Sequence, residues 1–310
     1  MKIGVWNVCG LNERTKQAEA VNFFKRNNLD LMGIIETRVR EGRVKGICRQ
    51  SFHLFQIINN YDYHPNGRIW IIWKKSSLNI QVLSRDSQWI HVRVNEVGRP
   101  PFIISFIYAF NTTQGRTALW DFLKGAAPSL PWVALGDFNC VRRSSERISS
   151  PLPDISAMTA YNDALYSAGL EELTTHGCPF TWTNKQDSID RKWMSFDRAV
   201  FNALWQSVFP ASVADVPTAG LSDHSPVLVS VWPPDDSRPK QFRFLNCWVQ
   251  DGRFLILVKE VWREPVYGSP MYRLVSHLKS LKDRLKQLHG ETYSSISARI
   301  DRLTSQLKVF

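Results

Sequence analysis

The segment Trp132–Cys140 places a carboxylate and a carboxamide two residues apart at the end of an apolar run. On an extended backbone, side chains at positions i and i+2 point to the same face, so Asp137 and Asn139 are presented together. This pair suits the binding of a phosphate ester beside a metal ion. A turn rich in Asp and Asn would have the same composition, because both side chains form local hydrogen bonds in turns. Taken alone, the segment favours the turn.

Polar side chains recur at the ends of other apolar runs and in the loops between them. Besides the pair above, they are Asn7, Glu36, Tyr108, Asn111, Asp197, Ser222, Asp223 and His224. Carboxylate and amide oxygens are the ligands that Mg²⁺ or Mn²⁺ prefers, and such an ion can polarise a phosphate oxygen. A histidine that is bonded to a carboxylate can orient or activate water. Each residue alone has a structural explanation, but the joint pattern predicts a hydrolytic site for phosphate esters.

Signatures of several other enzyme classes are absent from the sequence. It contains no P-loop, no GxGxxG, no GxSxG elbow and no pair of histidines at zinc-binding spacing. The five cysteines form no CxxC pair, which argues against a disulfide framework and favours a reducing compartment. No apolar run approaches the roughly 18 residues of a membrane span, and no signal-peptide pattern opens the chain. We therefore expect a nuclear or cytoplasmic protein without a membrane partner.

The composition indicates a folded chain, and its charge favours an acidic partner. The 310 residues are 44% hydrophobic and include 12 Trp and 17 Phe, which is enough for a dense core. The net charge of +11 favours association with nucleic acid, although ordinary basic surface charge would also account for it.

The candidate residues require strands to position them. Apolar runs at 3–6 and 29–35 predict two buried strands, and the periodicity of 15–28 predicts a helix between them. Runs of aromatic and β-branched residues between 52 and 109 predict a meander of mostly antiparallel strands. Further helices are predicted at 114–125, 155–168 and 201–207, and further strands at 132–135, 180–183, 194–200 and 227–232.

The character of the chain changes after residue 232. The Pro-rich segment 233–241 predicts a linker, so we expect one α/β domain over 1–232 and a basic helical extension over 242–310. A helix is predicted at 251–263. A second, at 272–289, carries leucines spaced 4-3-4-3, and a third after Gly290 would pair with it as an αα-hairpin. These leucines are Leu274, Leu278, Leu281, Leu285 and Leu288.

A set of short motifs resembles the endonuclease/exonuclease/phosphatase superfamily in type and in order. The motifs are Trp6–Gly10, Ile35–Thr37, Ile107–Asn111, Gly136–Asn139, Phe180–Trp182, Phe196–Arg198 and Ser222–Pro226. They are most similar to the apurinic-type endonuclease domains of plant LINE-type non-LTR retrotransposons, which the segments Gly67–Trp70 and Phe242–Trp248 also resemble. The resemblance covers about residues 1–232 and implies a four-layered α/β sandwich of two mixed β-sheets flanked by helices.

The resemblance also implies residue roles. Glu36 would be the main ligand of Mg²⁺ (or Mn²⁺), helped by Asn7, with Asp223 as a second carboxylate near the metal. Asp137 would position or activate the attacking water. Asn139 and His224 would contact the phosphate, and Asp197 would orient His224. Tyr108 and Asn111 would line the phosphate site. Thr181 and Ser222 would be further substrate contacts. Cys9 stands where many repair-type members have an acidic residue.

The implied reaction is nicking of DNA to leave a 3′-hydroxyl and a 5′-phosphate. DNA is the expected partner, and the basic tail makes template RNA a second one. Two other functions stay open: a catalytically inactive nucleic-acid-binding remnant, and a phosphatase that acts on a small phosphate ester. The sequence has no reverse transcriptase signature, so we expect it to be a fragment or a truncated copy of such an element.

Overall fold

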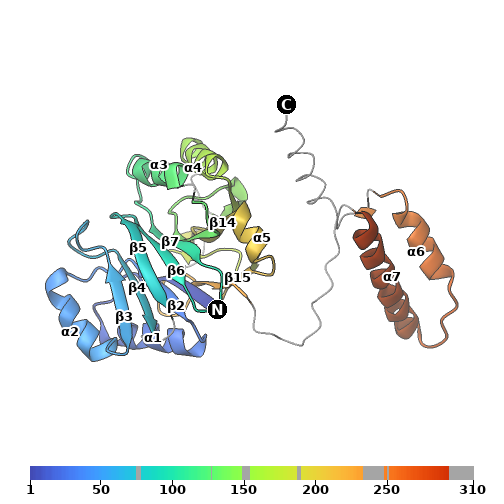
Figure 1. Ribbon diagram of the computed structural model, residues 1–310, viewed down its shortest axis with the longest axis horizontal. Coiled ribbons are helices and arrows are strands. Elements are labelled where there is room, and N and C mark those ends of the chain that lie inside the picture. The colour runs from blue at the N-terminus through green and yellow to red at the C-terminus, as the bar shows by residue number, and fades with distance from the viewer. Residues whose placement is uncertain are drawn as a thin grey trace. The chain divides into compact units, whose positions relative to one another are not determined.

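The computed structural model describes residues 1–74, 78–126, 128–148, 154–186, 190–232, 248–249 and 251–292. The chain divides into two compact units, Met1–Asp236 and Ser237–Phe310 (Figure 1). The predicted linker at 233–241 lies outside the described residues.

A seven-stranded mixed sheet contains the N-terminus of the first unit, in the order β11-β15-β16-β1-β2-β4-β3. The adjacent strands β1 (Lys2–Asn7) and β2 (Leu31–Ile35) run parallel and are joined by helix α1 (Arg14–Arg26). Both strands are almost wholly buried because both faces of the sheet are covered. The other strands are β3 (Phe55–Asn59), β4 (Ile69–Lys74), β11 (Thr175–Gly177), β15 (Val213–Val216) and β16 (Val227–Ser230).

A six-stranded mixed sheet, in the order β10-β14-β8-β7-β6-β5, forms the other half of the sandwich. Strand β8 (Trp132–Asp137) runs parallel to β7 (Phe102–Tyr108) and antiparallel to β14 (Asp197–Asn202). The remaining strands are β5 (Asn79–Arg85), β6 (Trp89–Asn95) and β10 (Leu170–Glu172).

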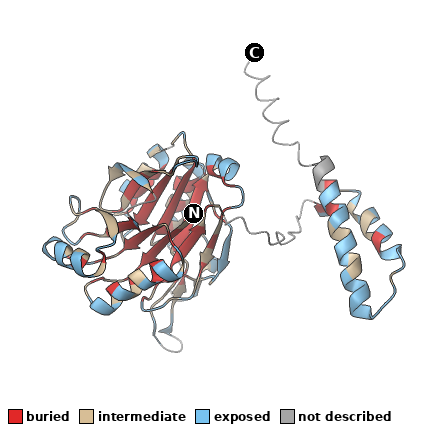
Figure 2. Cartoon of the chain, turned by 60° about the horizontal axis from the view of Figure 1, so that its bottom comes forward, coloured by how far each residue is buried: buried red, intermediate tan, exposed pale blue. Residues whose placement is uncertain are grey.

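Three hydrophobic clusters define four layers. One lies between the sheets and includes Val5 and Ile35 from the first and Ile104 and Leu135 from the second. A second joins the seven-stranded sheet to α1 and α2 (Glu41–Ser51). The third joins the six-stranded sheet to α3 (Thr117–Ala126) and α4 (Ile155–Ser167). Figure 2 shows the strands as the buried layers between exposed helices, which confirms the predicted sandwich of two mixed sheets flanked by helices.

Two predictions for this unit were wrong in detail. The expected meander at 52–109 is divided between the sheets, because β4 pairs with β2 and β3 whereas β5 pairs with β6. The expected strand at 194–200 is two strands, β13 (Trp193–Met194) and β14. The hydroxyl of Thr181 accepts hydrogen bonds from the backbone N–H groups of Phe196 and Asp197, which interrupts the ladder between them.

Strand β13 belongs to a small third sheet, β12-β13-β9, in which β12 is Trp182–Thr183 and β9 is Arg147–Ile148. A 3₁₀ turn at Ser144–Glu146 precedes β9, and helix α5 (Ala203–Val208) follows β14. This sheet places the segment around Trp182 beside the polar strand ends.

The second unit contains helices α6 (Phe254–Arg263) and α7 (Pro270–Thr292), which pack against each other. Leu285 and Leu288 are buried with Trp248, while Leu274 and Leu278 at the start of the leucine stripe are exposed. Helix α7 continues through Gly290, so the described hairpin is formed by α6 and α7. The predicted helix beyond Gly290, with Ile296, Ile300, Leu303 and Leu307, lies outside the described residues. Among the described helices, none has the length and apolarity that crossing a membrane requires.

Candidate active site

Strand register brings three predicted residues into one row. Asp137, at the end of β8, pairs with Tyr108 on β7 and with Asp197 on β14. Gly136 precedes it with φ +145°, and a Cβ at this position would lie 2.0 Å from the carbonyl oxygen of Ile107. The strand end therefore requires glycine at position 136 to keep β7 and β8 paired up to Asp137.

Asn7, at the end of β1, connects the two sheets. Its amide nitrogen donates to Glu36 Oε2 at 2.9 Å and to Asp137 Oδ2 at 3.0 Å. Its Oδ1 accepts the backbone N–H of Cys9 at 3.0 Å. Because the two carboxylates account for both of its N–H groups, the 3.3 Å approach of Asn7 Nδ2 to His224 Nε2 is a contact rather than a hydrogen bond.

His224 lies between two buried carboxylates. Its Nδ1 is 2.8 Å from Asp197 Oδ2, and its Nε2 is 3.8 Å from Asp137 Oδ2. Burial alone would lower the pKa of His224, but Asp197 and Asp137 outweigh burial and raise it to about 9. Burial and the charge of Asp197 also raise the pKa of Asp137 above its ordinary value. A carboxylate whose pKa is raised in this way suits a general base, and the hydrogen bond that His224 Nδ1 donates to Asp197 fixes the imidazole.

A second pair of carboxylates lies on the other side of Asn7. Glu36 directly follows β2 with φ 54°, a backbone conformation that non-glycine residues rarely adopt. It pairs with Arg38, and Cys9 Sγ lies 3.7 Å from its Oε1. Burial and the charges of Glu36 and Asp223 raise the pKa of the Cys9 thiol to about 11. The neutral thiol therefore stands between the carboxylates of Glu36 and Asp223.

These side chains line a cleft of about 360 Å³. Its lining includes Glu36, Asp223, Asp137, Asn139, His224, Tyr108 and Asn111, together with Cys9, Arg38, Trp182, Met194 and Phe196. Burial alone would raise the pKa of Asp223, but His224 and a hydrogen bond from Trp182 Nε1, 3.1 Å long, lower it. The structure thus gathers predicted residues that lie up to 188 positions apart in the chain, from Glu36 to His224.

Two predicted substrate contacts have partners in the backbone. Ser222 Oγ donates to the carbonyl oxygen of Asn7 at 2.6 Å and accepts the N–H of His224 at 3.2 Å. The hydroxyl of Thr181 likewise accepts the backbone N–H groups of Phe196 and Asp197. Both side chains are buried, so in this structure they position Asn7, His224 and Asp197.

Three arginines at the site were not assigned roles by sequence reasoning. Arg68 lies over the ring of Tyr108 at 4.1 Å, and Arg116 donates to the carbonyl oxygens of Asn111 and Asn139. Arg38 pairs with Glu36. Only Arg68 had a sequence signal, because it lies in the segment Gly67–Trp70 that accompanies the recognised motifs. Arg116 is recognisable only from its contacts in the folded chain, and Arg38 from its ion pair with Glu36 two residues before it.

Two groups of residues offer donors of the type that a divalent cation binds. Among the described residues, the ligand atoms of Asp137, Asp197 and His224 all lie within 4.8 Å of one another and could hold a metal ion. Glu36 and Asp223 form the second group, and both reach the cleft around Cys9. The second group consists of oxygen donors at an open cleft, which fits the preference of Mg²⁺ for carboxylates and retained water.

We expect His224 to remain protonated above neutral pH, because two carboxylates face it. A group whose folded-state pKa is raised contributes stability that is present below its unfolded pKa, near 6.5, and lost as pH rises through the folded value near 9. The free energy of unfolding should therefore fall over this range by on the order of 3 kcal/mol. NMR titration of the imidazole and urea unfolding measure the two quantities.

Asp197→Asn is the informative comparison for this titration. It removes the nearer negative charge, so the titration midpoint of His224 should drop by at least about one unit, and the loss of stability above pH 6.5 should shrink. An unchanged midpoint in Asp197→Asn would contradict the assignment of Asp197 as the group that raises the pKa of His224.

Residues 4–224 match the Endonuclease/Exonuclease/phosphatase family. The chain belongs to this family, whose members hydrolyse phosphoester bonds and are typically metal-dependent. No curated protein matches the sequence.

Solved structures of several nucleases and phosphatases share the fold. The endonuclease domain of TRAS1, a telomere-specific non-LTR retrotransposon, is 13% identical with a TM-score of 0.57, over 75% of this chain and 99% of that domain. The 3′ phosphatase NExo from Neisseria, bound to a product DNA hairpin, is 15% identical with a TM-score of 0.55, over 74% and 98% of the two chains. The AP endonuclease LMAP from Leishmania major is 12% identical with a TM-score of 0.58, over 74% and 86%.

Proposed function

We propose that the protein is a Mg²⁺-dependent DNA endonuclease that hydrolyses a phosphodiester to a 3′-hydroxyl and a 5′-phosphate. The observation that carries the proposal is the hydrogen-bonded connection from Glu36 through the buried Asn7 to Asp137, with the His224–Asp197 pair beside it. Glu36, Asp137 and His224 line one cleft. This arrangement combines a base, a phosphate contact and an acidic pair for a metal.

In this proposal Glu36 and Asp223 hold Mg²⁺, with Asn7 fixing the orientation of Glu36. The bound ion would supply positive charge that polarises the phosphate and stabilises the leaving oxygen. We favour this pair over Asp137, Asp197 and His224, because Asp197 and His224 are already bonded to each other and all three are buried. The cleft around Glu36 leaves room for the waters that Mg²⁺ retains.

Side chains of the protein supply proton transfer and phosphate binding in this proposal. Asp137 accepts the proton of the attacking water. Its carboxylate is oriented by the backbone N–H of Asn139, which donates to Oδ1 at 2.8 Å. Protonated His224 donates from Nε2 to a phosphate oxygen, while Asp197 keeps the ring in place. The amide of Asn139, which is anchored on the carbonyl oxygen of Ala109, and Tyr108 and Asn111 complete the phosphate contact.

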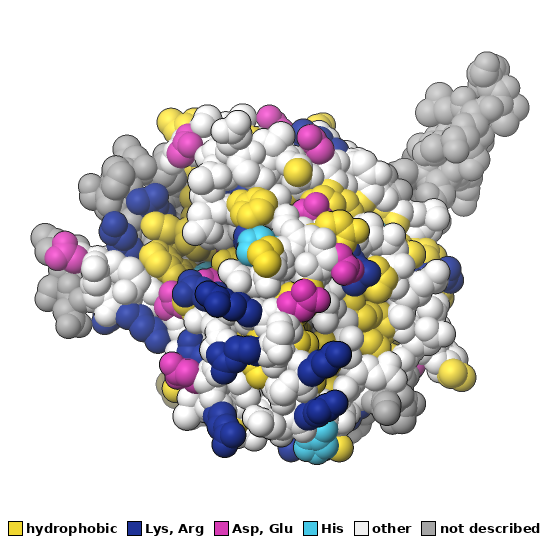
Figure 3. All heavy atoms as spheres, turned by 90° about the vertical axis from the view of Figure 1, so that its left-hand side faces the viewer, with side chains coloured by type: hydrophobic (Ala, Val, Ile, Leu, Met, Phe, Trp, Pro, Cys, Tyr) yellow, Lys and Arg dark blue, Asp and Glu magenta, His cyan; other side chains and the backbone are white. Residues whose placement is uncertain are grey.

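Charge supports DNA as the substrate. The net charge is +11, and Figure 3 shows Lys and Arg side chains gathered on the lower part of the face that carries α2. The exposed basic residues there include Arg38, Arg40, Arg43, Lys45 and Arg49. Such a surface favours the phosphate backbone of a nucleic acid over a small phosphate ester.

We further infer that the chain is the endonuclease of a plant LINE-type retrotransposon, in which the 3′-hydroxyl of the nick primes reverse transcription. The order of its motifs supports this role, and the fold shared with the TRAS1 domain is compatible with it. Template RNA would be a partner of the basic tail.

Incubation with supercoiled plasmid and Mg²⁺ tests the proposal. We expect nicked circles whose 3′ ends a DNA polymerase can extend, and no nicking in EDTA. Nicking that persists in EDTA would contradict the metal requirement. Hydrolysis of a small phosphate ester with intact plasmid would identify a phosphatase, and a salt-dependent gel shift with no hydrolysis would identify a binding remnant.

A further inference from the structure

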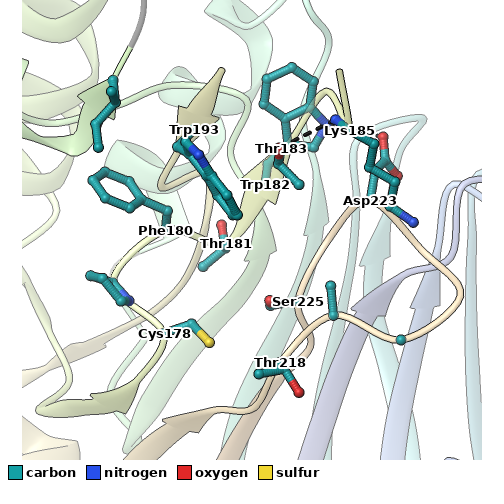
Figure 4. Close-up of a pocket in the computed structure, with 14 residues that line it drawn as sticks. Cys178, Phe180, Thr181, Trp182, Thr183, Lys185, Trp193, Thr218, Asp223 and Ser225 are labelled. Carbon is teal, nitrogen blue, oxygen red and sulfur yellow. Dashed lines mark hydrogen bonds between the residues drawn. The ribbon is translucent and has the colours of Figure 1, made fainter. Parts of the chain in front are cut away.

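A second hollow of about 590 Å³ lies beside the candidate active cleft. Its walls are mainly apolar and include the rings of Phe180, Trp182 and Trp193. Figure 4 shows Phe180 and Trp193 on one side, Trp182 and Asp223 on the other, and Thr218 and Ser225 below. We call this hollow the aromatic pocket. Its volume lies in the range of about 300–1,000 Å³ that is typical of sites for small molecules.

The aromatic pocket is continuous with the cleft through shared residues. Trp182 and Asp223 line both, and the indole N–H of Trp182 donates to Asp223 Oδ2 at 3.1 Å. The rings of Trp182 and His224 are 6.4 Å apart, and the two residues form an isolated β-bridge. Because Trp182 and Asp223 are shared walls, the pocket lies next to the position of a phosphate at His224.

The chemistry of the pocket fits a nucleobase. Aromatic rings offer a stacking surface that accepts the face of any base, and the hydroxyls of Thr183, Thr218 and Ser225 can bond to its edge. Lys185 lies in the lining, and the guanidinium of Arg191 lies 5.7 Å from the ring centroid of Trp193. These two cations complement the phosphates on either side of a base that enters the pocket.

We propose that the aromatic pocket binds one unstacked nucleobase of the DNA strand, next to the phosphate at the active site. This inference rests on the proposed nuclease function. A base in the pocket must leave its stack, so the protein should prefer DNA that is unpaired or easily opened at this position. The pocket would then contribute to the choice of cleavage site.

The test compares two short single-stranded oligonucleotides that have the same number of phosphates. One carries normal bases, and the other carries abasic sugars near its centre. Anisotropy with the full chain in EDTA measures binding without cleavage. We expect the strand with bases to bind about 5- to 150-fold more tightly, which is the range for stacking one base on aromatic side chains.

Two pocket variants and one control make the result specific. Trp193→Ala removes a wall and Ala219→Phe fills the hollow, and each should abolish the preference for bases. Tyr166→Ala removes an aromatic ring that is 89% exposed on α4 and does not line the pocket, so it should keep the preference.

Equal binding of both strands by wild type would overturn the proposal. A preference for bases that survives in Ala219→Phe would also overturn it. The same holds if both pocket variants lose the binding of an apolar dye but still bind the strand with bases more tightly. A preference for bases without plasmid nicking would leave the pocket assignment standing and contradict the proposed endonuclease, so the two failures are distinguishable.

Discussion

Replacing Asp137 with asparagine is expected to reduce plasmid nicking by roughly 100- to 10,000-fold, the range for loss of a general base. Asparagine has the same shape and keeps an oxygen for the N–H of Asn139, but it cannot take a proton from water. Initial rates of conversion of supercoiled to nicked plasmid measure the effect.

The same variant should stay folded, because two effects on its stability oppose each other. The substitution removes one of two buried like charges, since Asp137 is 1% exposed and its register partner is Asp197. It also replaces the oxygen that accepts from Asn7 with an NH₂ group. Thermal unfolding therefore separates a catalytic loss from misfolding. Asp121→Asn is the matched control, because Asp121 is exposed on α3, and it should nick at the wild-type rate. Equal rates in the two variants would exclude Asp137 as the base.

Gly136→Ala is expected to destabilise the first unit by at least about 3 kcal/mol, in the upper part of the range for single substitutions. The added methyl would lie 2.0 Å from the carbonyl oxygen of Ile107, in a backbone region with φ +145° that L side chains rarely adopt. Relief of the clash requires β8 to move away from β7. Because Asp137 is the next residue, nicking should fall together with stability.

Gly125→Ala provides the control. A methyl at this glycine of α3 would meet no atom within 4 Å, and alanine favours a helix, so stability should stay constant or rise by up to about 1 kcal/mol. Urea unfolding of both variants measures the difference. A Gly136→Ala protein as stable as Gly125→Ala would show that the close pairing of β7 and β8 does not depend on glycine.

Much of the fold could be predicted because buried strands have simple patterns. The apolar runs before Asn7, Glu36 and Asp137 correspond to β1, β2 and β8. Helix α2 was not predicted, since its segment contains two glycines and buries only Ile47. The division of the predicted meander depends on which strands pair across the sandwich, and local composition carries no information on that choice.

The candidate site was predictable as a set of residue types, but its geometry was not. Motif order collected Asn7, Glu36, Asp137 and His224, yet their separations depend on packing between the two sheets. The amide of Asn7 bonds to both Glu36 and Asp137, a connection that no spacing in the sequence reveals. For the same reason, the contribution of Arg116 became visible only through its contacts with the loop carbonyl oxygens.

The site residues come from two sheets, so substitutions between the sheets can alter the spacing of these residues. Asn7 belongs to one sheet and bonds to Asp137 of the other at 3.0 Å, and His224, before β16, bonds to Asp197 at 2.8 Å. The spacing of these reacting groups is therefore set by the hydrophobic contact between the sheets, including residues such as Ile104. A change in that contact would move these groups relative to one another without replacing any residue of the cleft. Substitutions between the sheets are therefore expected to change the rate of the hydrolysis that we propose for this site.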